Sequence, residues 1–328
     1  MFAPSPVVTV TIEHVGGVPE VHFHPGGQGF WVARMAAVLG ADVTLCAPIG
    51  GEPGKVLAAL LEDEPLSLKA VSTQGWTGVY VHDRREGERA SIAEAPSATL
   101  LRHETDSLYG VALAAGLHAV VTLMTGPRHE SVIDADVYRR LTLDLRANGG
   151  RVMADLTGPP LAAVLEAGCD LVKLNDDELV QAGWASGHDA SELVGGLERL
   201  CARGAESALV TRGPEPALAL ADGRLLELRG PRFSAIDAHG SGDSMFAALG
   251  VEAARGHGLV DSLRMAVAAG ALNATRRGLG TGGRAEIEDV ARRVSIDELC
   301  LADNAVRTER PPEPGARAAP RAPGSTRA

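Results

Sequence analysis

Short apolar runs alternate with segments of helical periodicity along most of this chain, and this alternation is the strongest constraint on its fold. The run "DVTLCAPIG" over 42–50, for example, lies between a helical pattern over 29–40 that Gly40 closes and another over 55–64. Buried apolar strands that alternate with helices are typical of a parallel sheet covered by helices on both faces. We therefore expect an α/β fold with a mostly parallel central sheet. Further strands are predicted over 7–12, 118–124, 151–156, 170–175 and 207–213, with helices around 131–147 and 160–167.

Two stretches interrupt the alternation of strands and helices. Residues 76–92 alternate in the manner of a β-hairpin with charged residues near its turn, and together with the first strand they are expected to form a small separate sheet. Residues 214–229 indicate a second hairpin, because the dipeptide Asp222-Gly223 suits the positive-φ positions of a tight hairpin turn. The main sheet is therefore expected to be mostly, rather than wholly, parallel.

The chain of 328 residues changes character near its end. From Asp303 onward it is rich in Pro and Arg and has no apolar periodicity, which is typical of a disordered segment. We expect one domain over residues 1–302 and a disordered tail over 303–328. No stretch approaches the roughly 18 apolar residues of a membrane span, and no basic region followed by an apolar run marks a signal peptide.

Charge and cysteine content exclude several classes of function. The net charge of −11 argues against a nucleic-acid partner, because phosphate backbones are bound by basic surfaces. It does not argue against a nucleotide ligand, which needs only a local patch of donors. The four cysteines are far apart and form no CxxC pair, so neither a zinc site nor a disulfide framework is predicted. We expect a cytoplasmic protein with no membrane or nucleic-acid partner.

The segment "IDAHGSGDSM", Ile236 to Met245, places two glycines and an aspartate directly before a helix-like stretch. The first amides of a helix lack partners within it, and glycines let the backbone approach an anion closely, so this arrangement favours a bound phosphate. Asp243 would repel that phosphate unless it takes a proton from an incoming hydroxyl, as a general base does. The alternative is an ordinary helix cap. The spacing matches neither a GxxxxGK[ST] loop nor a GxGxxG turn.

Four segments together resemble a known family. "DAHGSGDSMFAALG" is similar to the C-terminal signature of the ribokinase-like, or PfkB, carbohydrate kinases, which reads D-x-x-G-[AS]-G-D before a helix. "PGGQGFWVARMAAVLGADVTLCAPIGGEPG" resembles the family's N-terminal block, "LVKLNDDEL" its KPNxxE segment and "AAGALNATRRGLGTGGRAEIEDV" its closing helices. The segments follow the family's order over roughly residues 1–295. The resemblance is nearest to the hexose-phosphate kinases, the branch of 1-phosphofructokinase and tagatose-6-phosphate kinase.

This resemblance implies a ribokinase-like fold, in which three α/β/α layers carry a small β lid, here from about 7–15 and 74–94. It also implies a phosphotransferase that uses ATP and Mg²⁺ to phosphorylate a hydroxyl of a small sugar or sugar phosphate. Lids of this family often pair between subunits, so the resemblance further implies that two copies can form a homodimer through the lid.

The resemblance assigns roles to the residues of the phosphoryl-transfer half of the site. Asp243 would deprotonate the acceptor hydroxyl, and the amides of Gly240, Ser241 and Gly242 would form the anion hole for the transferring phosphoryl group. Phosphoryl transfer depends mainly on positioning and charge stabilisation, which such a loop can supply. The residues implied at the nucleotide are Thr211, Gly213 and Asn273, and those implied to organise Mg²⁺ and its waters are Asn175 and Glu178.

Several of these residues also have a purely structural interpretation. Asn175 and Glu178 form the N-x-x-E pattern of a helix capping box, a role that is compatible with metal binding. Asn273 alternatively faces solvent on a helix, and Asp237 is alternatively a turn residue. His239 stands where the family usually has Thr or a small apolar residue, and it either donates to the nucleotide or points away. The sequence leaves these alternatives open.

The acceptor side departs from the family pattern. Val7 stands where the family has an Asp that holds sugar hydroxyls, and Gln28 replaces the Lys of the GGKGxN motif. Gly78 and Tyr80 stand where the hexose-phosphate kinases have the Arg and Asn of a TRxN segment. The Lys and Arg that would hold a sugar phosphate are therefore both absent. The acceptor residues that the resemblance implies are Gly26, Gly27, Gln28, Trp31 and Tyr80.

Other side chains are candidates to compensate for this loss. The aromatic faces of Trp31, which replaces the Asn of the same motif, and of Tyr80 suit a sugar ring or a heterocycle. Trp31 alternatively packs under its own helix. The cations that could replace the missing Lys and Arg are Arg84, Arg85, Arg89 and Arg128, for which the alternative is a solvated surface charge.

These observations lead to three functional hypotheses. The first is an ATP-dependent, 1-phosphofructokinase-like hexose kinase that acts on a sugar or sugar phosphate. The second is a kinase for an uncharged acceptor, such as a nucleoside or free sugar, which the missing Lys and Arg favour. The third is a catalytically silent regulator that binds a nucleotide or metabolite, and the retained Asp243 counts against it.

Overall fold

The structure, a computed structural model, describes residues 1–87, 89–276 and 278–299. The tail expected over 303–328 lies outside these ranges. The helices are α1 (Gln28–Val38), α2 (Gly51–Glu62), α3 (Arg102–Gly116), α4 (Asp136–Ala147), α5 (Gly158–Ala167), α6 (Asp176–Gln181), α7 (Ala190–Ala202), α8 (Ser241–Ala254), α9 (Leu259–Asn273) and α10 (Arg284–Ala291), with a 3-10 turn η1 (Glu130–Val132). The strands are β1 (Val7–Val15), β2 (Val18–Gly26), β3 (Thr44–Gly50), β4 (Ser67–Thr73), β5 (Gly78–Asp83), β6 (Ala90–Ala95), β7 (Val121–Thr125), β8 (Arg151–Asp155), β9 (Leu171–Asn175), β10 (Ala208–Arg212), β11 (Glu215–Ala221), β12 (Arg224–Arg229) and β13 (Ser295–Glu298). Among these described helices, none combines the length and apolar character needed to span a membrane.

The central sheet is mostly parallel, as the sequence predicts. Its order is β13-β12-β11-β10-β9-β8-β7, in which β7 to β10 are parallel and the other pairs antiparallel. Phe2 forms parallel bridges to Cys46 in β3 and to Met124 in β7, and thereby joins the parallel pair β3–β4 to this sheet. The predicted hairpin turn lies between β11 and β12, where Asp222 and Gly223 have φ of 52° and 72°. The carboxyl ends of β7 to β10 meet at one edge, which is where open α/β sheets bind ligands.

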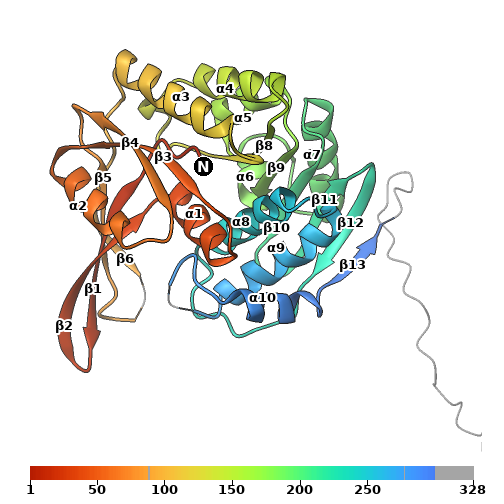
Figure 1. The fold of residues 1–328 in the computed structure, drawn as a ribbon. Coiled ribbons are helices and arrows are strands. Elements are labelled where there is room, and N and C mark those ends of the chain that lie inside the picture. The colour runs from red at the N-terminus through yellow and green to blue at the C-terminus, as the bar shows by residue number, and fades with distance from the viewer. Residues whose placement is uncertain (88, 277, 300–328) are drawn as a thin grey trace, which may run out of the picture.

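Two layers of helices cover the two faces of the central sheet (Figure 1). On one face α1, α8, α9 and α10 pack around Phe30, Met35 and Phe246. On the other face α3, α4, α5 and α7 pack around Phe2 and Tyr138. The predicted three-layer α/β/α arrangement is therefore confirmed. In α4 the buried positions recur every three or four residues, as one helix face requires: Val137, Tyr138, Leu141, Thr142 and Leu145.

A separate four-stranded sheet of order β2-β1-β5-β6 forms the lid, at the left of Figure 1. The lid expected from 7–15 and 74–94 omits β2, so the structure adds a strand to it. The sequence of β2, "VPEVHFHPG", mixes Val and Phe with Glu, His and Pro and contains no apolar run. Only its antiparallel pairing with β1 identifies it as a strand. In this pairing Val7 lies opposite Gly26, and Val15 lies opposite Val18.

The two faces of the lid differ in chemistry. Strand pairing places Thr9, Thr11, His22, His24, Tyr80, His82 and Glu94 on one face, and Val10, Ile12, Val21, Phe23, Val81 and Ala93 on the other. The guanidinium of Arg128, which follows β7, lies over the Tyr80 ring with its carbon 4.1 Å from the ring centroid. The polar face of the lid is therefore turned toward the carboxyl edge of the central sheet.

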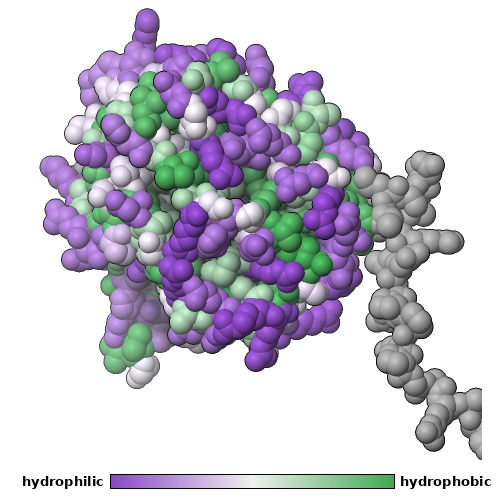
Figure 2. Space-filling model, turned by 45° about the vertical axis from the view of Figure 1, so that its right-hand side comes forward, coloured by the Kyte–Doolittle hydropathy of each residue, from purple (hydrophilic) through white to green (hydrophobic). Residues whose placement is uncertain are grey.

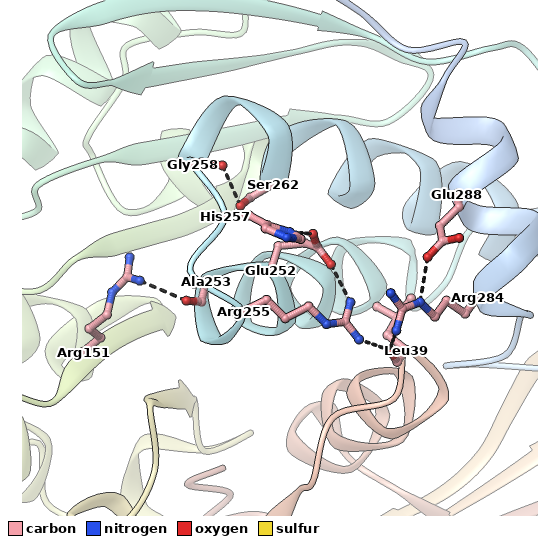
Figure 3. A network of polar contacts seen from close by, with 10 residues as sticks. All are labelled: Leu39, Arg151, Glu252, Ala253, Arg255, His257, Gly258, Ser262, Arg284 and Glu288. Carbon is pink, nitrogen blue, oxygen red and sulfur yellow. Dashed lines mark hydrogen bonds and ion pairs between the residues drawn. The ribbon is translucent and has the colours of Figure 1, made fainter.

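Helices α1 and α8 lie side by side in the same direction, and a network of polar contacts fixes their C-terminal ends (Figure 3). Arg255 donates to Glu252 at 2.7 Å and to the carbonyl oxygen of Leu39, which ends α1. His257 also contacts Glu252, whose side chain is buried, and Arg284 of α10 donates to the same Leu39 carbonyl at 3.5 Å. These contacts fix the position of α8, whose opposite end carries Asp243.

Candidate active site

The loop before α8 has the conformation of an anion-binding turn. Gly240 is the N-cap in the left-handed region, with φ of 73°, which favours glycine. A Cβ added at Gly242 would lie 2.6 Å from Nζ of Lys173, so a side chain at this position would have to displace the Lys173 ammonium. The amide of Ser241 donates to the Ala238 carbonyl at 3.3 Å, whereas those of Gly242 and Asp243 have no acceptor among the described residues. Two free amides at the positive end of α8 suit a phosphoryl group.

Asp243 lies in the first turn of α8, where a carboxylate cluster surrounds it. Burial raises the pKa of Asp243 to about 7, with further raising by the carboxylates of Asp155 and Glu178. The ammonium of Lys173 and a hydrogen bond from the Gln28 side chain act in the opposite direction. A general base is most effective when its pKa is close to the working pH, so this environment is suited to proton abstraction at neutral pH.

A buried ion pair that the sequence analysis did not identify packs against Gly242 in the loop before α8. Asp155 ends β8 and lies directly opposite Lys173 in β9, with Nζ 2.8 Å from Oδ2 and both side chains almost fully buried. Burial alone would lower the pKa of Lys173, but the carboxylates of Asp155, Glu178 and Asp243 together raise it. A lysine inside the apolar strand "LVKLN" is itself a sign of a buried acidic partner.

Asn175 and Glu178 form the predicted capping box at the start of α6. Asn175 Oδ1 accepts from the Glu178 amide at 2.7 Å, and Glu178 Oε2 accepts from the Asn175 amide at 2.8 Å. Burial, and next the charge of Asp155, raise the pKa of the Glu178 carboxyl. Thr211 is paired with Asn175 across the adjacent strand, and Gly213 follows in the turn with open space beside it. These four residues therefore share the carboxyl edge with Asp243.

The donor atoms at this edge fit a hard cation that keeps most of its water. Asp155, Asn175 and Glu178 offer carboxylate and amide oxygens, the ligands that Mg²⁺ prefers. Within the described ranges, no three His, Cys, Asp or Glu side chains are arranged to enclose a metal directly. This set matches an ion held by one or two carboxylates together with substrate phosphates, and it does not match an all-protein cage.

Asp237, His239 and Asn273 hold the loop before α8 in place. Asp237 accepts from the His239 amide, contacts the His239 ring at 2.6 Å, and forms an ion pair with Arg84 of the lid at 2.6 Å. Asn273 is buried, and its side chain donates to the His239 carbonyl at 2.8 Å and accepts from the Gly280 amide at 3.1 Å. The alternative that Asn273 faces solvent is therefore wrong. Asp237 is a turn residue, and the His239 ring points toward it.

The acceptor residues of the N-terminal block lie at the start of α1. Gly26 packs against Thr9, and Gly27, the N-cap of α1, packs against the backbone of Ser5. Gln28 Oε1 accepts from the Gly126 amide, which follows β7, at 3.2 Å. The Trp31 ring packs edge-on against Phe30, with centroids 4.8 Å apart, and contacts the core. Packing is thus the observed role of Trp31 in this structure.

The lid brings several cations together beside Tyr80. Arg128 forms an ion pair with Glu94 at 2.5 Å, and Arg84 is held by Asp237. Arg89 contacts Nε2 of the buried His82 at 2.6 Å and has no ion pair within the described residues. Burial, and next the charge of Arg89, lower the pKa of His82 to about 4, so the ring is neutral at pH 7. Arg85 lies on the exposed turn and pairs with Asp83.

Buried polar atoms without a partner gather around this region. Ser5 Oγ, the Tyr80 hydroxyl and His82 Nδ1 are buried and make no hydrogen bond within the described part of the chain, and neither does Ser241 Oγ in the loop before α8. Native structures rarely leave buried polar groups unsatisfied, so such groups indicate where a polar ligand binds. Tyr80 and His82 lie on the polar face of the lid, and Ser241 lies two residues before Asp243 in the first turn of α8.

Comparison with known proteins gives consistent results. The chain is 28% identical over 260 residues to the ATP-dependent 6-phosphofructokinase isozyme 2 of Escherichia coli (strain K12), covering 78% of this chain and 83% of that protein. It is 30% identical over 278 residues to the 1-phosphofructokinase of Haloferax volcanii, covering 80% and 87%. The crystal structure of E. coli phosphofructokinase-2 in complex with potassium matches with a TM-score of 0.78 at 24% identity, over 88% of this chain and 96% of that one.

The fold extends to more distant relatives and agrees with a family model. Arabidopsis thaliana ribokinase, in complex with ribose and ATP, matches with a TM-score of 0.69 at 18% identity, over 89% of this chain and 99% of that chain. The ribokinase-like fold is therefore confirmed, and the named relatives are kinases. The model of the pfkB family carbohydrate kinases matches residues 8–285, so the chain belongs to the pfkB family of carbohydrate kinases.

Proposed function

We propose that this protein transfers the γ-phosphoryl group of ATP to a hydroxyl of a phosphorylated sugar, with Asp243 as the general base. The observation that carries this proposal is a carboxyl with a pKa of about 7 beside the amides of Gly242 and Asp243, which have no acceptor among the described residues. Curated relatives are named for kinases of fructose and tagatose phosphates, which supports a phosphorylated acceptor.

In the proposed reaction Asp243 takes the proton of the acceptor hydroxyl. The hydroxyl oxygen forms a bond to the γ-phosphorus while the bond to the β–γ bridging oxygen breaks, which leaves ADP. The amides of Gly242 and Asp243, with the Gly240 turn, stabilise the charge of the transferring group. Lys173 supplies positive charge beneath Gly242.

Nucleotide and metal are proposed to bind along the same edge. Thr211 and Gly213 would border the nucleotide, and Asn273 would act by holding the loops of His239 and Gly280. Asn175 and Glu178 would hold Mg²⁺ and its waters. When bound, Mg²⁺ neutralises charge on the triphosphate. Glu178 would contribute a carboxylate oxygen to that ion, next to the amide oxygen of Asn175.

The acceptor phosphate is proposed to bind Arg89 and His82 in place of the missing Lys and Arg. Arg84 and Arg128 are already paired with carboxylates, whereas Arg89 has no such partner among the described residues. His82 Nδ1 and the Tyr80 hydroxyl, which make no hydrogen bond within the described residues, add two polar groups on the same face. A kinase for an uncharged acceptor is the second candidate, because Gln28 and Gly78 stand where the family's cations would be.

The experiment that separates these candidates measures ADP release with MgATP over sugars, sugar phosphates and nucleosides. We expect turnover only with a phosphorylated sugar. Arg89→Met should raise KM for that acceptor about 10–100-fold and leave KM for ATP unchanged, since it removes a charge-assisted hydrogen bond. Arg85→Met, on the exposed turn, is the matched control.

Other outcomes of this experiment have distinct meanings. Turnover confined to unphosphorylated acceptors, with Arg89→Met unaffected, would establish the second candidate. Binding of MgATP without turnover on any acceptor would contradict both candidates and favour a catalytically silent regulator.

A homodimer through the outer face of the lid is proposed as well. Val21 and Phe23 on this face are 54% and 51% exposed, and Figure 2 shows hydrophobic surface at the lower tip, where the β1–β2 hairpin projects. Exposed apolar side chains gathered on one sheet face mark an interaction site. Sedimentation velocity should give the mass of a dimer, and Phe23→Asp should give a monomer. Leu117→Asp, on an exposed Leu outside the lid, should remain dimeric; a monomeric native chain contradicts the proposal.

A further inference from the structure

Arg84, which follows lid strand β5, forms an ion pair with Asp237 in the loop before α8. Nη2 of Arg84 lies 2.6 Å from Oδ2 of Asp237, and the two side chains are only 21% and 13% exposed, so solvent screens this contact little. The backbone of Arg84 is fixed as well, because its amide donates to the Ile12 carbonyl of β1 at 2.7 Å. Arg84 thus joins the lid sheet to a loop that lies 153 positions away in the chain.

The other carboxylate oxygen of Asp237 holds the turn that leads into α8. Oδ1 accepts from the His239 amide at 3.0 Å and contacts Nδ1 of the His239 ring at 2.6 Å. Because a carboxylate is planar, a contact that fixes one oxygen also fixes the direction of the other, whereas the terminal torsion of an unpaired Asp is soft. The ion pair with Arg84 therefore determines how Asp237 holds the backbone of His239, one residue before the N-cap Gly240.

The end of α9 holds the opposite side of this loop. The Ala274 carbonyl accepts from the Asp237 amide at 3.2 Å, and the Asn273 side chain donates to the His239 carbonyl at 2.8 Å. These contacts act on the backbone and do not fix the Asp237 carboxylate. Among the described residues, no Arg or Lys other than Arg84 forms an ion pair with Asp237.

A second ion pair joins the lid to the end of β7 and does not involve this loop. Glu94 of β6 pairs with Arg128 at 2.5 Å, and the Arg128 guanidinium lies over the Tyr80 ring. Both ion pairs hold the lid to the body of the protein, but the pair of Arg84 is the one that ends on the loop before α8. A variant at Glu94 therefore separates general loosening of the lid from loss of the contact with the loop.

We propose that Arg84 is a positioning residue, which through Asp237 connects the lid to the loop before α8 and keeps the amides of Gly242 and Asp243 oriented for the transferring phosphoryl group. This inference rests on the proposed function of those two amides. It gives Arg84 a role different from the acceptor binding for which the sequence made it a candidate. The phosphoryl-binding geometry then depends on the position of the lid.

The first measurement is hydrogen exchange of the His239 amide in the protein without ligand. Arg84→Met should increase the exchange rate about 10-fold, because the amide loses an acceptor of fixed direction. Asp237→Asn, which keeps the acceptor oxygen but not the charge, should act in the same way. The double variant should exchange no faster than the faster single variant, because both changes break one ion pair. Arg84→Lys, which keeps the charge, should restore most of the protection.

The second measurement is the affinity for MgADP with and without aluminium fluoride, a mimic of the transferring phosphoryl group that needs no acceptor. In Arg84→Met the gain in affinity from aluminium fluoride should fall about 10–100-fold, while the affinity for MgADP alone stays the same, since only the oriented amides are affected. Arg85→Met, on the same turn and paired with Asp83, is the matched control for both measurements. Glu94→Gln should leave the exchange of the His239 amide unchanged.

The outcomes separate this inference from the proposed function. Unchanged exchange of the His239 amide in both Arg84→Met and Asp237→Asn would overturn the connection between lid and loop. An effect of Arg84→Met confined to the KM of the acceptor would also overturn it and make Arg84 an acceptor ligand. If exchange responds as expected but aluminium fluoride adds no affinity in the native protein, the proposed function of the Gly242 and Asp243 amides fails while the connection stands.

Discussion

Asp243→Asn should lower kcat by about 10²–10⁴-fold while binding of MgATP is retained. Asn has nearly the same size as Asp, but it cannot take a proton from the acceptor hydroxyl. The free amides of Gly242 and of residue 243 remain in place, so the phosphoryl-binding geometry should persist. The measurement is single-turnover ADP formation at pH 8, together with the affinity for MgATP by calorimetry.

The same variant should be more stable than the native protein at pH 8. The pKa of Asp243 is raised from 3.8 to about 7 in the folded chain, so between these values the folded state binds more protons than the unfolded one. Stability contributed by this group is therefore lost as the pH rises from about 4 to 7. The Asn side chain does not ionise, so the variant does not lose this stability as the pH rises. We expect a gain of about 1–3 kcal/mol in the free energy of unfolding at pH 8 and little gain at pH 4.5.

Asp261→Asn, an exposed aspartate in the first turn of α9, is the matched control for both measurements. It should change neither kcat nor the pH dependence of stability. If Asp243→Asn retains more than a tenth of native kcat, another group accepts the proton. If it loses stability at pH 8, Asp243 is not the buried, disfavoured anion that the structure indicates.

The sequence was sufficient for those features that depend on local signals. Alternating apolar runs and helical periodicity predicted the layers, the Asp222-Gly223 dipeptide predicted its turn, and the N-x-x-E pattern predicted the capping box of Asn175 and Glu178. Each depends on residues close together in the chain, whose physical preferences act directly. The catalytic and phosphate-binding roles of the loop over 240–243 stay predictions. The family resemblance implies these roles, and the geometry of the loop is compatible with them.

Features that depend on pairing between distant segments were beyond the sequence. Asp155 and Lys173 meet only because β8 and β9 align in one particular register, and one residue of slippage would turn them to opposite faces. Strand β2 lacks an apolar run and is defined by its partner β1. Asn273 looks like a surface polar residue until two loops are seen to meet at its amide. In each case the missing information is which strand or loop is the neighbour.

Lys173→Met should cost about 3–5 kcal/mol of stability at pH 8, because it leaves buried carboxylates without their cation. The variant removes the ammonium that interacts with three carboxylates, those of Asp155, Glu178 and Asp243. Because these carboxylates are buried, water cannot replace the Lys173 ammonium in stabilising their negative charge. At pH 5, protonation of Asp243, whose pKa is raised to about 7, should make the loss smaller. Urea unfolding at the two pH values measures both effects.

A double-mutant cycle distinguishes this explanation from a simple loss of packing. Lys69→Met, an exposed lysine in β4, should be nearly neutral. The double variant Lys173→Met, Asp155→Leu should be more stable than Lys173→Met alone. The single variant leaves the buried charge of Asp155 unpaired, whereas the double variant replaces both charges by apolar side chains. If the stability losses of Lys173→Met and Asp155→Leu simply add up in the double variant, the 2.8 Å contact between the two side chains contributes no interaction energy. Recovery of stability without recovery of activity would mean that Lys173 is needed beneath Gly242 for phosphoryl transfer, beyond its part in holding the strands together.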